Sequence, residues 1–423
     1  MMPSKSRRQA LSHVGGAIEL VGDPDYGRIL QYALEVQSAE ADTETELQRP
    51  HLHAFHSYPA RLHPETAARL IAGLSDTLAP DQAPLGVPVV YDPFCGSGTV
   101  LLEGAMLGHP VVGTDLNPLA IALCRLKLAN PTDAEHAALL AAGANAAKVA
   151  DERRTSRAGA SHRFCDEDRE MFAPHVLLEL DGLQVGIAAQ APPLREPLRL
   201  MLSSLLTKLS RKNGDSAGGP LTEKRIAAGY SAKLFRKRTE EFVRQQREFR
   251  SRRGEPAEVV LSEDDATSLK SVRTASVDLV VTSPPYAATY DYLSHHELRL
   301  RWLGFTPKRF AEGELGARRV YSALSSTAAD ARWHDELSRM LQALARVTRP
   351  GAKVALIMAD SALRGHPLRA DDAVLDAIGE LPFDAIAKAS QQRPHFHLGT
   401  QDAYRDAPRR EHVLLLGRNS GRY

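Results

Sequence analysis

Short apolar runs that alternate with helical segments are the feature that most restricts how this chain can fold. Four such runs each end in polar residues, and segments of helical spacing follow the first two, in the order strand, helix, strand, helix. Strands that are apolar throughout suit a sheet that is covered on both faces. We therefore predict a doubly wound α/β domain whose first strands lie at 87–91, 110–113, 259–261 and 277–282.

The same alternation returns near the carboxyl end. Helical spacing is expected at 333–347 and 373–378, and strands are expected at 353–358, 384–388 and 412–416. The last two strands are predicted to pair as an antiparallel hairpin at the edge of the sheet. The sequence thus predicts seven strands.

Residues 131–255 interrupt this pattern, because their apolar residues follow helical spacing. We interpret them as an inserted helical subdomain. Between Arg195 and Arg253 sixteen lysines or arginines stand against six acidic residues. This excess favours a nucleic-acid contact, and a solvated helix face with i,i+4 ion pairs explains it equally well. The candidate contacts are Lys208, Arg211, Lys212, Arg236, Lys237 and Arg238.

The overall numbers exclude some classes of protein and leave the function open. The 423 residues carry a net charge of +1, so any nucleic acid must be met by a local basic surface. Three widely spaced cysteines fit a reducing interior. The amino end has no apolar core of a signal peptide, and no apolar run is long enough to span a membrane. We expect a cytoplasmic protein without a membrane partner.

A glycine loop follows the first strand, as D-P-F-C-G-S-G-T at 92–99. Gly96 and Gly98 allow backbone conformations that other residues avoid, and the helix behind them presents free N–H groups to an anion such as a carboxylate. Asp115 ends the next strand, where an acidic side chain accepts hydrogen bonds from ribose. A dinucleotide site is disfavoured because Leu101 replaces the third glycine of that fingerprint. A turn with a capping aspartate is the purely structural alternative.

The fourth strand ends in T-S-P-P-Y at 282–286. Two prolines remove both N–H groups, so the carbonyls of Ser283 and Pro284 become fixed acceptors at the edge of the sheet where ligands bind. Acceptors that hold the protons of an exocyclic amine aim its lone pair at a methyl donor. Tyr286 is expected to stack on a flipped-out base. We predict that Ser283, Pro284, Pro285 and Tyr286 are the catalytic residues.

The pair D-P-F-C-G-S-G-T and T-S-P-P-Y resembles the amino-group DNA methyltransferases, and the serine is similar to their N4-cytosine branch. Further similarity lies in H-S-Y-P-A-R-L-H-P at 56–64, in 290–304 and in R-R-E-H-V-L-L-L. The resemblance implies a class I, Rossmann-like methyltransferase sheet, S-adenosylmethionine (SAM) as cofactor and duplex DNA as partner. After the third strand, Asp264 or Asp265 could hydrogen-bond the adenine amino group of SAM, and capping of the next turn explains both equally well. The predicted SAM-binding residues, from the resemblance, the glycine loop and the ends of the second and third strands, are His56, Tyr58, Pro59, Ala60, Asp92, Pro93, Phe94, Gly96, Ser97, Gly98, Thr99, Asp115, Asn117 and Asp265.

The expected organisation is an arm over 1–50, of loose order or short helices, a SAM-binding part over 51–130, the insertion over 131–255, and a catalytic part over 256–423. The expected reaction is methylation of cytosine N4, or adenine N6, in DNA. An RNA methyltransferase acting on guanine N2 and a non-catalytic nucleic-acid-binding module remain as alternatives. No metal ligand set is predicted, and a partner restriction nuclease cannot be read from the sequence.

Overall fold

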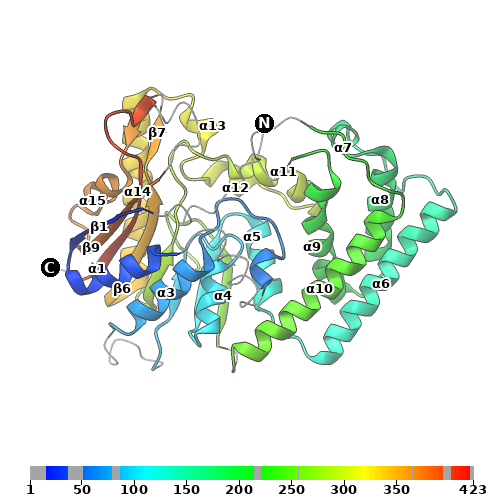
Figure 1. Ribbon diagram of the computed structural model, residues 1–423, viewed down its shortest axis with the longest axis horizontal. Helices are drawn as coiled ribbons and strands as arrows, with labels where there is room; N and C mark the ends of the chain where they lie inside the picture. The colour runs from blue at the N-terminus through cyan, green and yellow to red at the C-terminus, as the bar shows by residue number, and fades with distance from the viewer. Residues whose placement is uncertain are drawn as a thin grey trace.

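The protein is described by a computed structural model over residues 16–36, 51–78, 86–213, 221–255, 257–363, 365–393 and 402–419. Within these residues the central feature is an eight-stranded sheet in the order β1-β9-β10-β6-β5-β2-β3-β4. Neighbouring strands from β4 to β6 pair in parallel, and β10 and β9 pair antiparallel. The sheet lies at one end of the molecule and a group of long helices lies at the other (Figure 1).

The doubly wound α/β prediction is confirmed, and every expected strand is present. These strands are β2 (Val90–Asp92), β3 (Val111–Asp115), β4 (Val259–Glu263), β5 (Val277–Thr282), β6 (Thr348–Ala359), β9 (Phe383–Gln392) and β10 (Arg410–Arg418). A separate two-stranded ribbon consists of β7 (Ser361–Leu363) and β8 (His366–Leu368).

The prediction of seven strands with a hairpin at the edge is wrong in one respect. The hairpin of β9 and β10 exists, but β1 (Ile18–Gly22) pairs antiparallel with β9 and becomes the edge strand. Gly22 has a φ of 95°, and a side chain there would lie 2.4 Å from the carbonyl oxygen of Ile386. The strand was missed because its residues are mostly exposed and show no apolar run. The helix α1 (Pro24–Leu34) follows it directly.

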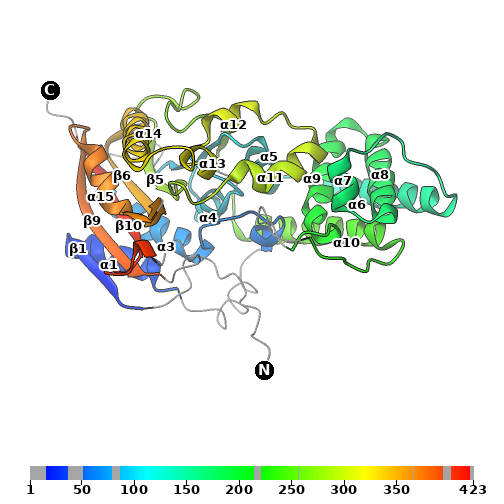
Figure 2. The same cartoon turned by 90° about the horizontal axis from the view of Figure 1, so that it is seen from above.

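Alternate residues of each strand enter two separate cores, as the period of two requires. Leu279 and Val281 of β5 pack with α1, α3 (Pro64–Ser75), α4 (Thr99–Met106) and α5 (Pro118–Leu128). Val280 packs instead with α14 (Ser326–Val347) and α15 (Ala370–Ile378). Figure 2 shows the sheet between α1 and α3 on one side and α14 on the other. Both faces are therefore covered, as the apolar strands indicate.

The described residues of the segment 131–255, which we interpret as an insertion, contain five helices. They are α6 (Asp133–Thr155), α7 (Asp166–Met171), α8 (Pro174–Ala188), α9 (Pro192–Leu209) and α10 (Tyr230–Arg252). Close packing of α6 on α8 depends on glycine, since side chains at Gly182 and Gly186 would lie 3.0 Å and 2.6 Å from the backbone of α6. No helix in the described ranges combines the length and the apolar character that a membrane crossing requires.

The insertion is joined to the sheet domain by buried polar and aromatic contacts. The Phe55 ring lies 4.6 Å from that of Phe242 on α10, and the amide of Gln246 donates to the Leu126 carbonyl. Three elements from outside the insertion are η1 (His51–Ala54), α11 (Tyr292–Leu303) and α12 (Lys308–Gly313). Trp302 of α11 donates to Asp168 of α7. We conclude that the insertion is packed firmly onto the sheet domain.

Candidate active site

The two motifs lie side by side because β2 and β5 are neighbouring parallel strands, with Val90 opposite Leu279. Parallel neighbours bring their carboxyl ends to the same edge of the sheet. There the Thr282 hydroxyl donates to Oδ1 of Asp92 at 2.7 Å. One buried hydrogen bond thus joins the first residue of T-S-P-P-Y to the first residue of the glycine loop, 190 positions earlier in the chain.

The glycine loop requires its glycines for two reasons. Gly96 and Gly98 have φ values of 47° and 84°, which side chains rarely adopt. A side chain at Gly98 would also lie 2.9 Å from the sulfur of Cys124, and one at Gly96 would lie 3.1 Å from the Tyr58 ring. Gly98 begins α4 without a side-chain cap. The first N–H groups of α4 are therefore available to an anionic ligand.

Asp115 at the end of β3 stabilises the glycine loop through hydrogen bonds. Its Oδ2 accepts from the Gly96 N–H at 2.9 Å, and its Oδ1 accepts from the Asn117 N–H at 2.8 Å. Burial raises the pKa of Asp115 to about 6, although these two hydrogen bonds oppose the shift. The carboxylate keeps lone pairs that ribose hydroxyls can use, which is the role expected from its position.

Asp92 is the more strongly perturbed acid. Burial raises its pKa to about 7, against the effect of hydrogen bonds from Thr282 and from the Phe94 N–H. Both bonds fall on Oδ1, and the described residues provide no hydrogen bond to Oδ2. A cationic ligand in contact with Oδ2 would restore the charged form. The sulfonium and ammonium groups of SAM are such cations.

A cleft opens between the two motifs. Twelve of the predicted site residues line it: Tyr58, Pro59, Ala60, Asp92, Pro93, Phe94, Gly96, Ser97, Thr99, Asp115, Ser283 and Pro285. The groups that line this cleft fit SAM. The uncapped start of α4 suits its carboxylate, the buried acids suit its cations and its ribose, and the apolar walls suit its adenine. The glycine turn and the double proline therefore face one shared space.

Six predicted residues lie outside this lining. His56 is buried and its Nε2 lies 3.1 Å from the Ser203 hydroxyl of α9, so it joins the insertion to the domain. Asn117 caps α5 and donates to the Tyr58 hydroxyl. Asp265 accepts from Thr267, while its neighbour Asp264 lines the cleft instead. The remaining three are Gly98, Pro284 and Tyr286.

Several lining residues were not predicted. Tyr292 begins α11, Phe310 lies on α12, and Glu314 follows α12. Glu314 accepts from the Tyr292 N–H and from Arg319, and burial nevertheless raises its pKa. The similarity of 290–304 to the family was the one signal that pointed to this segment. The other members of the set are Arg61, Leu62, Cys95, Val100, Leu116, Ala266, Gly313 and Leu315.

Four of the six basic residues that were predicted to contact nucleic acid form local ion pairs. Arg236 lies 3.5 Å from Glu240, and both Lys237 and Arg238 lie within 4 Å of Glu241. Arg211 pairs with Glu223 and also donates to the Glu170 carbonyl, and Lys208 is exposed near the end of α9. Lys212 donates its backbone N–H to Ser210. This geometry matches the solvated-face alternative for part of α10.

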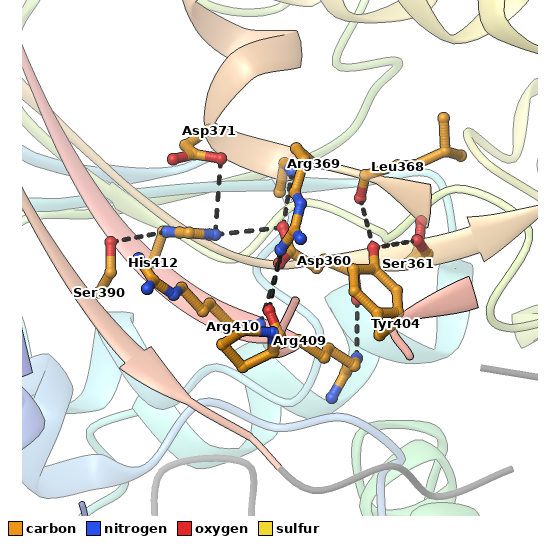
Figure 3. Close-up of polar contacts among 12 residues, drawn as sticks. Asp360, Ser361, Leu368, Arg369, Asp371, Ser390, Tyr404, Arg409, Arg410 and His412 are labelled. Carbon is orange, nitrogen blue, oxygen red and sulfur yellow. Dashed lines mark hydrogen bonds and ion pairs between the residues drawn. The ribbon is translucent and has the colours of Figure 1, made fainter. Parts of the chain in front are cut away.

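A cluster of Asp360, Asp371 and His412 lies where β6, α15 and β10 meet, with ligand atoms close enough together to hold a metal ion (Figure 3). Its charges are already balanced, because Arg369 binds Asp360 at 2.8 Å and Lys388 binds Asp371 at 2.6 Å. Although burial acts in the opposite direction, the hydrogen bond and charge of His412 keep the pKa of Asp360 below its usual value. We interpret the cluster as a structural ion network.

Comparison with known families identifies the class of this domain. Residues 65–160, which contain the glycine loop and Asp115, match the model of the RMKL-like, methyltransferase domain. The match covers less than a quarter of the chain, and the doubly wound sheet around it has the Rossmann-like fold of methyltransferases. SAM is the cofactor of this class of enzyme, in agreement with the predicted cofactor.

Two curated relatives and one solved structure are similar to parts of the chain. The type II methyltransferase M.MvaI of Kocuria varians is 40% identical over 75 residues, 18% of this chain and 15% of that protein. The tRNA (guanine(10)-N2)-dimethyltransferase of Methanothermobacter thermautotrophicus (strain Delta H) is 38% identical over 69 residues, 16% and 18% of the two chains. The chain therefore matches less than a fifth of either relative's length. TrmN from Thermus thermophilus superposes over 88% of this chain and 52% of its own, with 13% identity and a TM-score of 0.34.

Proposed function

We propose that this protein is a SAM-dependent methyltransferase that acts on an exocyclic amino group of a nucleic-acid base. The observation that carries the proposal is the shared cleft, whose walls include the glycine loop on one side and Ser283 and Pro285 on the other. A SAM molecule on the loop would present its methyl group to an amine held at S-P-P-Y. Methyl transfer of this kind needs orientation and electrostatics, and no covalent nucleophile.

Cytosine N4 in DNA is the first candidate target, because serine heads the catalytic motif. The relative M.MvaI, a type II methyltransferase, supports this choice. Guanine N2 in RNA is the second candidate, and the tRNA (guanine(10)-N2)-dimethyltransferase supports it over a segment of similar length. A role within a restriction-modification system belongs to the first candidate only.

The exposed face of α10 is proposed as a nucleic-acid contact. Lys233, Lys237, Arg244 and Arg247 are exposed at helical spacing along one stripe, and Lys233 and Arg244 form no ion pair with any described residue. The slope of log affinity against log salt concentration is negative for nucleic-acid binding. Changing Lys233, Lys237 and Arg244 together to glutamine is expected to make this slope shallower by up to about 3. An unchanged slope would mean that this stripe is a solvated helix face that does not contact nucleic acid.

The decisive experiment supplies SAM with a deuterated methyl group to the protein. The acceptors are amplified bacterial genomic DNA, which carries no methylation, and a pool of transfer RNA transcribed in vitro. Mass spectrometry of the digested nucleosides then identifies the modified base. Ser283→Ala serves as the matched variant, because it keeps the carbonyl but removes the hydroxyl that hydrogen-bonds the Tyr286 side chain; it is expected to bind SAM normally and to turn over more slowly. If neither acceptor gains label at any base, the proposed function is wrong.

A further inference from the structure

A cavity of about 250 Å³ lies between α8, α9 and the carboxyl end of α11, and it shares no lining residue with the SAM cleft. In this part of the molecule α9 packs against both α8 and α11 (Figure 1). None of the predicted site residues lines this cavity. Because a cavity of about 150 Å³ is enough to bind benzene, this one has room for a larger ring system or for a ring with a substituent.

Most of the cavity wall is apolar, and part of it is aromatic. Its buried apolar residues are Ile187, Leu202, Leu206 and Leu303. Trp302 of α11 also lines it, and the indole is held in place, because its N–H donates to Asp168 and its ring meets that of Phe172 at 5.7 Å between centroids. A fixed aromatic surface of this kind favours a planar ring as the ligand.

Two arginines line the same cavity without an acidic partner. Arg195 and Arg199 lie four positions apart on α9, so their like charges face the same side of the helix and repel each other. Both side chains are exposed, and neither forms an ion pair with a described residue. Nε of Arg195 donates to the Gln190 carbonyl at 2.7 Å, and Arg199 donates to the Leu303 carbonyl. These two bonds hold the guanidinium groups at the cavity and leave their other N–H donors for a ligand.

The remaining polar groups of the wall do not offset this positive charge. No acidic residue is among the described residues that line the cavity, and Glu196, between the two arginines in the chain, lies outside the lining. The Ser203 hydroxyl is already engaged by Nε2 of His56 at 3.1 Å. The half-buried Gln184 contributes an amide that forms no side-chain hydrogen bond with a described residue. The cavity therefore combines an apolar interior with two unbalanced positive charges.

A phosphate monoester matches these two charges better than a carboxylate does. Arginine binds both groups through paired hydrogen bonds, but a carboxylate carries one negative charge and a phosphate monoester carries up to two near neutral pH. An aliphatic ligand without charge would leave both guanidinium groups unpaired. The charge and the shape of the wall thus indicate a ring that carries a phosphate.

We propose that this cavity is a second ligand site, which binds an aromatic phosphate monoester with its phosphate on Arg195 and Arg199 and its ring against Trp302 and the apolar wall. A nucleoside monophosphate has this chemistry, and so does the 5′-phosphorylated end of a nucleic-acid strand. The inference goes beyond the proposed function, and its test does not require methylation.

Calorimetric titration with 1-naphthyl phosphate at pH 8, where the phosphate is a dianion, is the first test. The protein is saturated with S-adenosylhomocysteine, so that the probe cannot occupy the SAM cleft. One molecule of 1-naphthyl phosphate is expected to bind per protein. 1-Naphthol lacks the phosphate and is expected to bind at least about 10-fold more weakly.

Two variants of the cavity are compared with a matched control. Changing Arg195 and Arg199 together to glutamine is expected to weaken 1-naphthyl phosphate binding by about 100-fold or more, because the charge-assisted hydrogen bonds are lost. Ala188→Trp fills the cavity from an exposed position on α8 and should weaken binding by about 10-fold or more, although both charges remain. Changing Arg163 and Arg225 to glutamine removes two exposed charges of the insertion from outside the cavity, so affinity should stay within about two-fold.

The outcomes of this titration decide the proposal. Absence of 1-naphthyl phosphate binding, equal affinity for 1-naphthol, or an affinity that the double arginine variant retains would each overturn it. Thermal melting shows whether each variant is folded, and the arginine variant decides the matter if Ala188→Trp is not. Binding by a protein that methylates neither nucleic acid would uphold this site and contradict the proposed function.

The source of the phosphate is identified in the same assay. The four ribonucleoside 5′-monophosphates are compared with a short oligonucleotide that carries a 5′-phosphate and with the same oligonucleotide without it. Tighter binding of a monophosphate would assign a free nucleotide to the cavity. Tighter binding of the 5′-phosphorylated oligonucleotide than of its unphosphorylated form and of the monophosphates would assign a strand end.

Discussion

The raised pKa of Asp92 predicts that SAM binding depends on pH in a way that one substitution removes. Asp92 is buried and lines the cleft, its pKa is raised to about 7, and its Oδ2 accepts no hydrogen bond from the described residues. SAM should bind best when this carboxylate is charged. Lowering the pH protonates it and removes the attraction.

The magnitude follows from the pKa. At pH 5.5 about 3% of Asp92 is ionised in the free protein, so SAM affinity is expected to be about 30-fold weaker than at pH 8.5. Asp115, with a pKa raised to about 6, adds a smaller factor of about four over the same range. Asp92→Asn should bind SAM weakly at every pH and retain only the smaller Asp115 dependence.

Ionisation of Asp92, which should strengthen SAM binding, should lower the stability of the ligand-free protein. A carboxyl whose folded pKa is raised binds its proton more tightly in the folded state, so it lowers stability as pH rises from about 4 through 7. Asp92→Asn removes this penalty and should raise the free energy of unfolding of the ligand-free protein at pH 8 by about 1–3 kcal/mol. The substitution thus stabilises the fold while it weakens the site.

Calorimetric titration with SAM between pH 5.5 and 8.5, and thermal unfolding without ligand, check both effects. Asp376→Asn, which removes an exposed carboxylate from α15, is the control and should change neither. An Asp92→Asn protein whose SAM affinity keeps the full pH dependence would refute the reasoning, because the titrating group would then be another residue.

Three further predictions concern the elements that build the site. Gly98→Ala should lower the free energy of unfolding by about 1–3 kcal/mol, because of its φ of 84° and a close contact, whereas Gly108→Ala, with a φ of 83° and open space around it, should lower it by less; chemical denaturation compares the two. Thr282→Val removes a hydrogen bond that favours the charged form of Asp92, so the midpoint of SAM binding should move to higher pH in the same titration. Asp360→Asn should cost about 2–4 kcal/mol at pH 7, and because the pKa of Asp360 is lowered by folding, the difference from wild type should shrink as the pH falls below about 4; equal melting temperatures at pH 7 would contradict the ion network.

The fold was predictable where burial leaves a mark on the sequence. The parallel strands are apolar throughout because helices cover both of their faces, and β5 was predicted with its bounds unchanged. The edge strand β1 was not predictable in this way, since four of its five residues are exposed. Its pairing is fixed by β9, which lies more than 350 residues away in the chain.

The site was predictable where a motif carries its own geometry. The glycine loop and T-S-P-P-Y each follow a strand, and the parallel pairing of β2 and β5 brings them together. Glu314 lies in a segment without such a signature, and only tertiary contacts bring it to the cleft. The basic excess of the insertion predicted a patch, but sequence alone cannot tell which charges are paired; the structure pairs Arg236 with Glu240.

The most direct test of the central claim is a structure of the protein with S-adenosylhomocysteine bound. Methyl transfer requires the donor carbon and the amine to approach to about 3–3.5 Å, so the sulfur must face the Ser283–Pro285 turn across the shared cleft. We predict the carboxylate of the ligand at the start of α4, its ribose on Asp115 and its sulfur directed at Ser283. A ligand bound elsewhere, or with its sulfur turned away from Ser283 behind the glycine loop, would contradict the account.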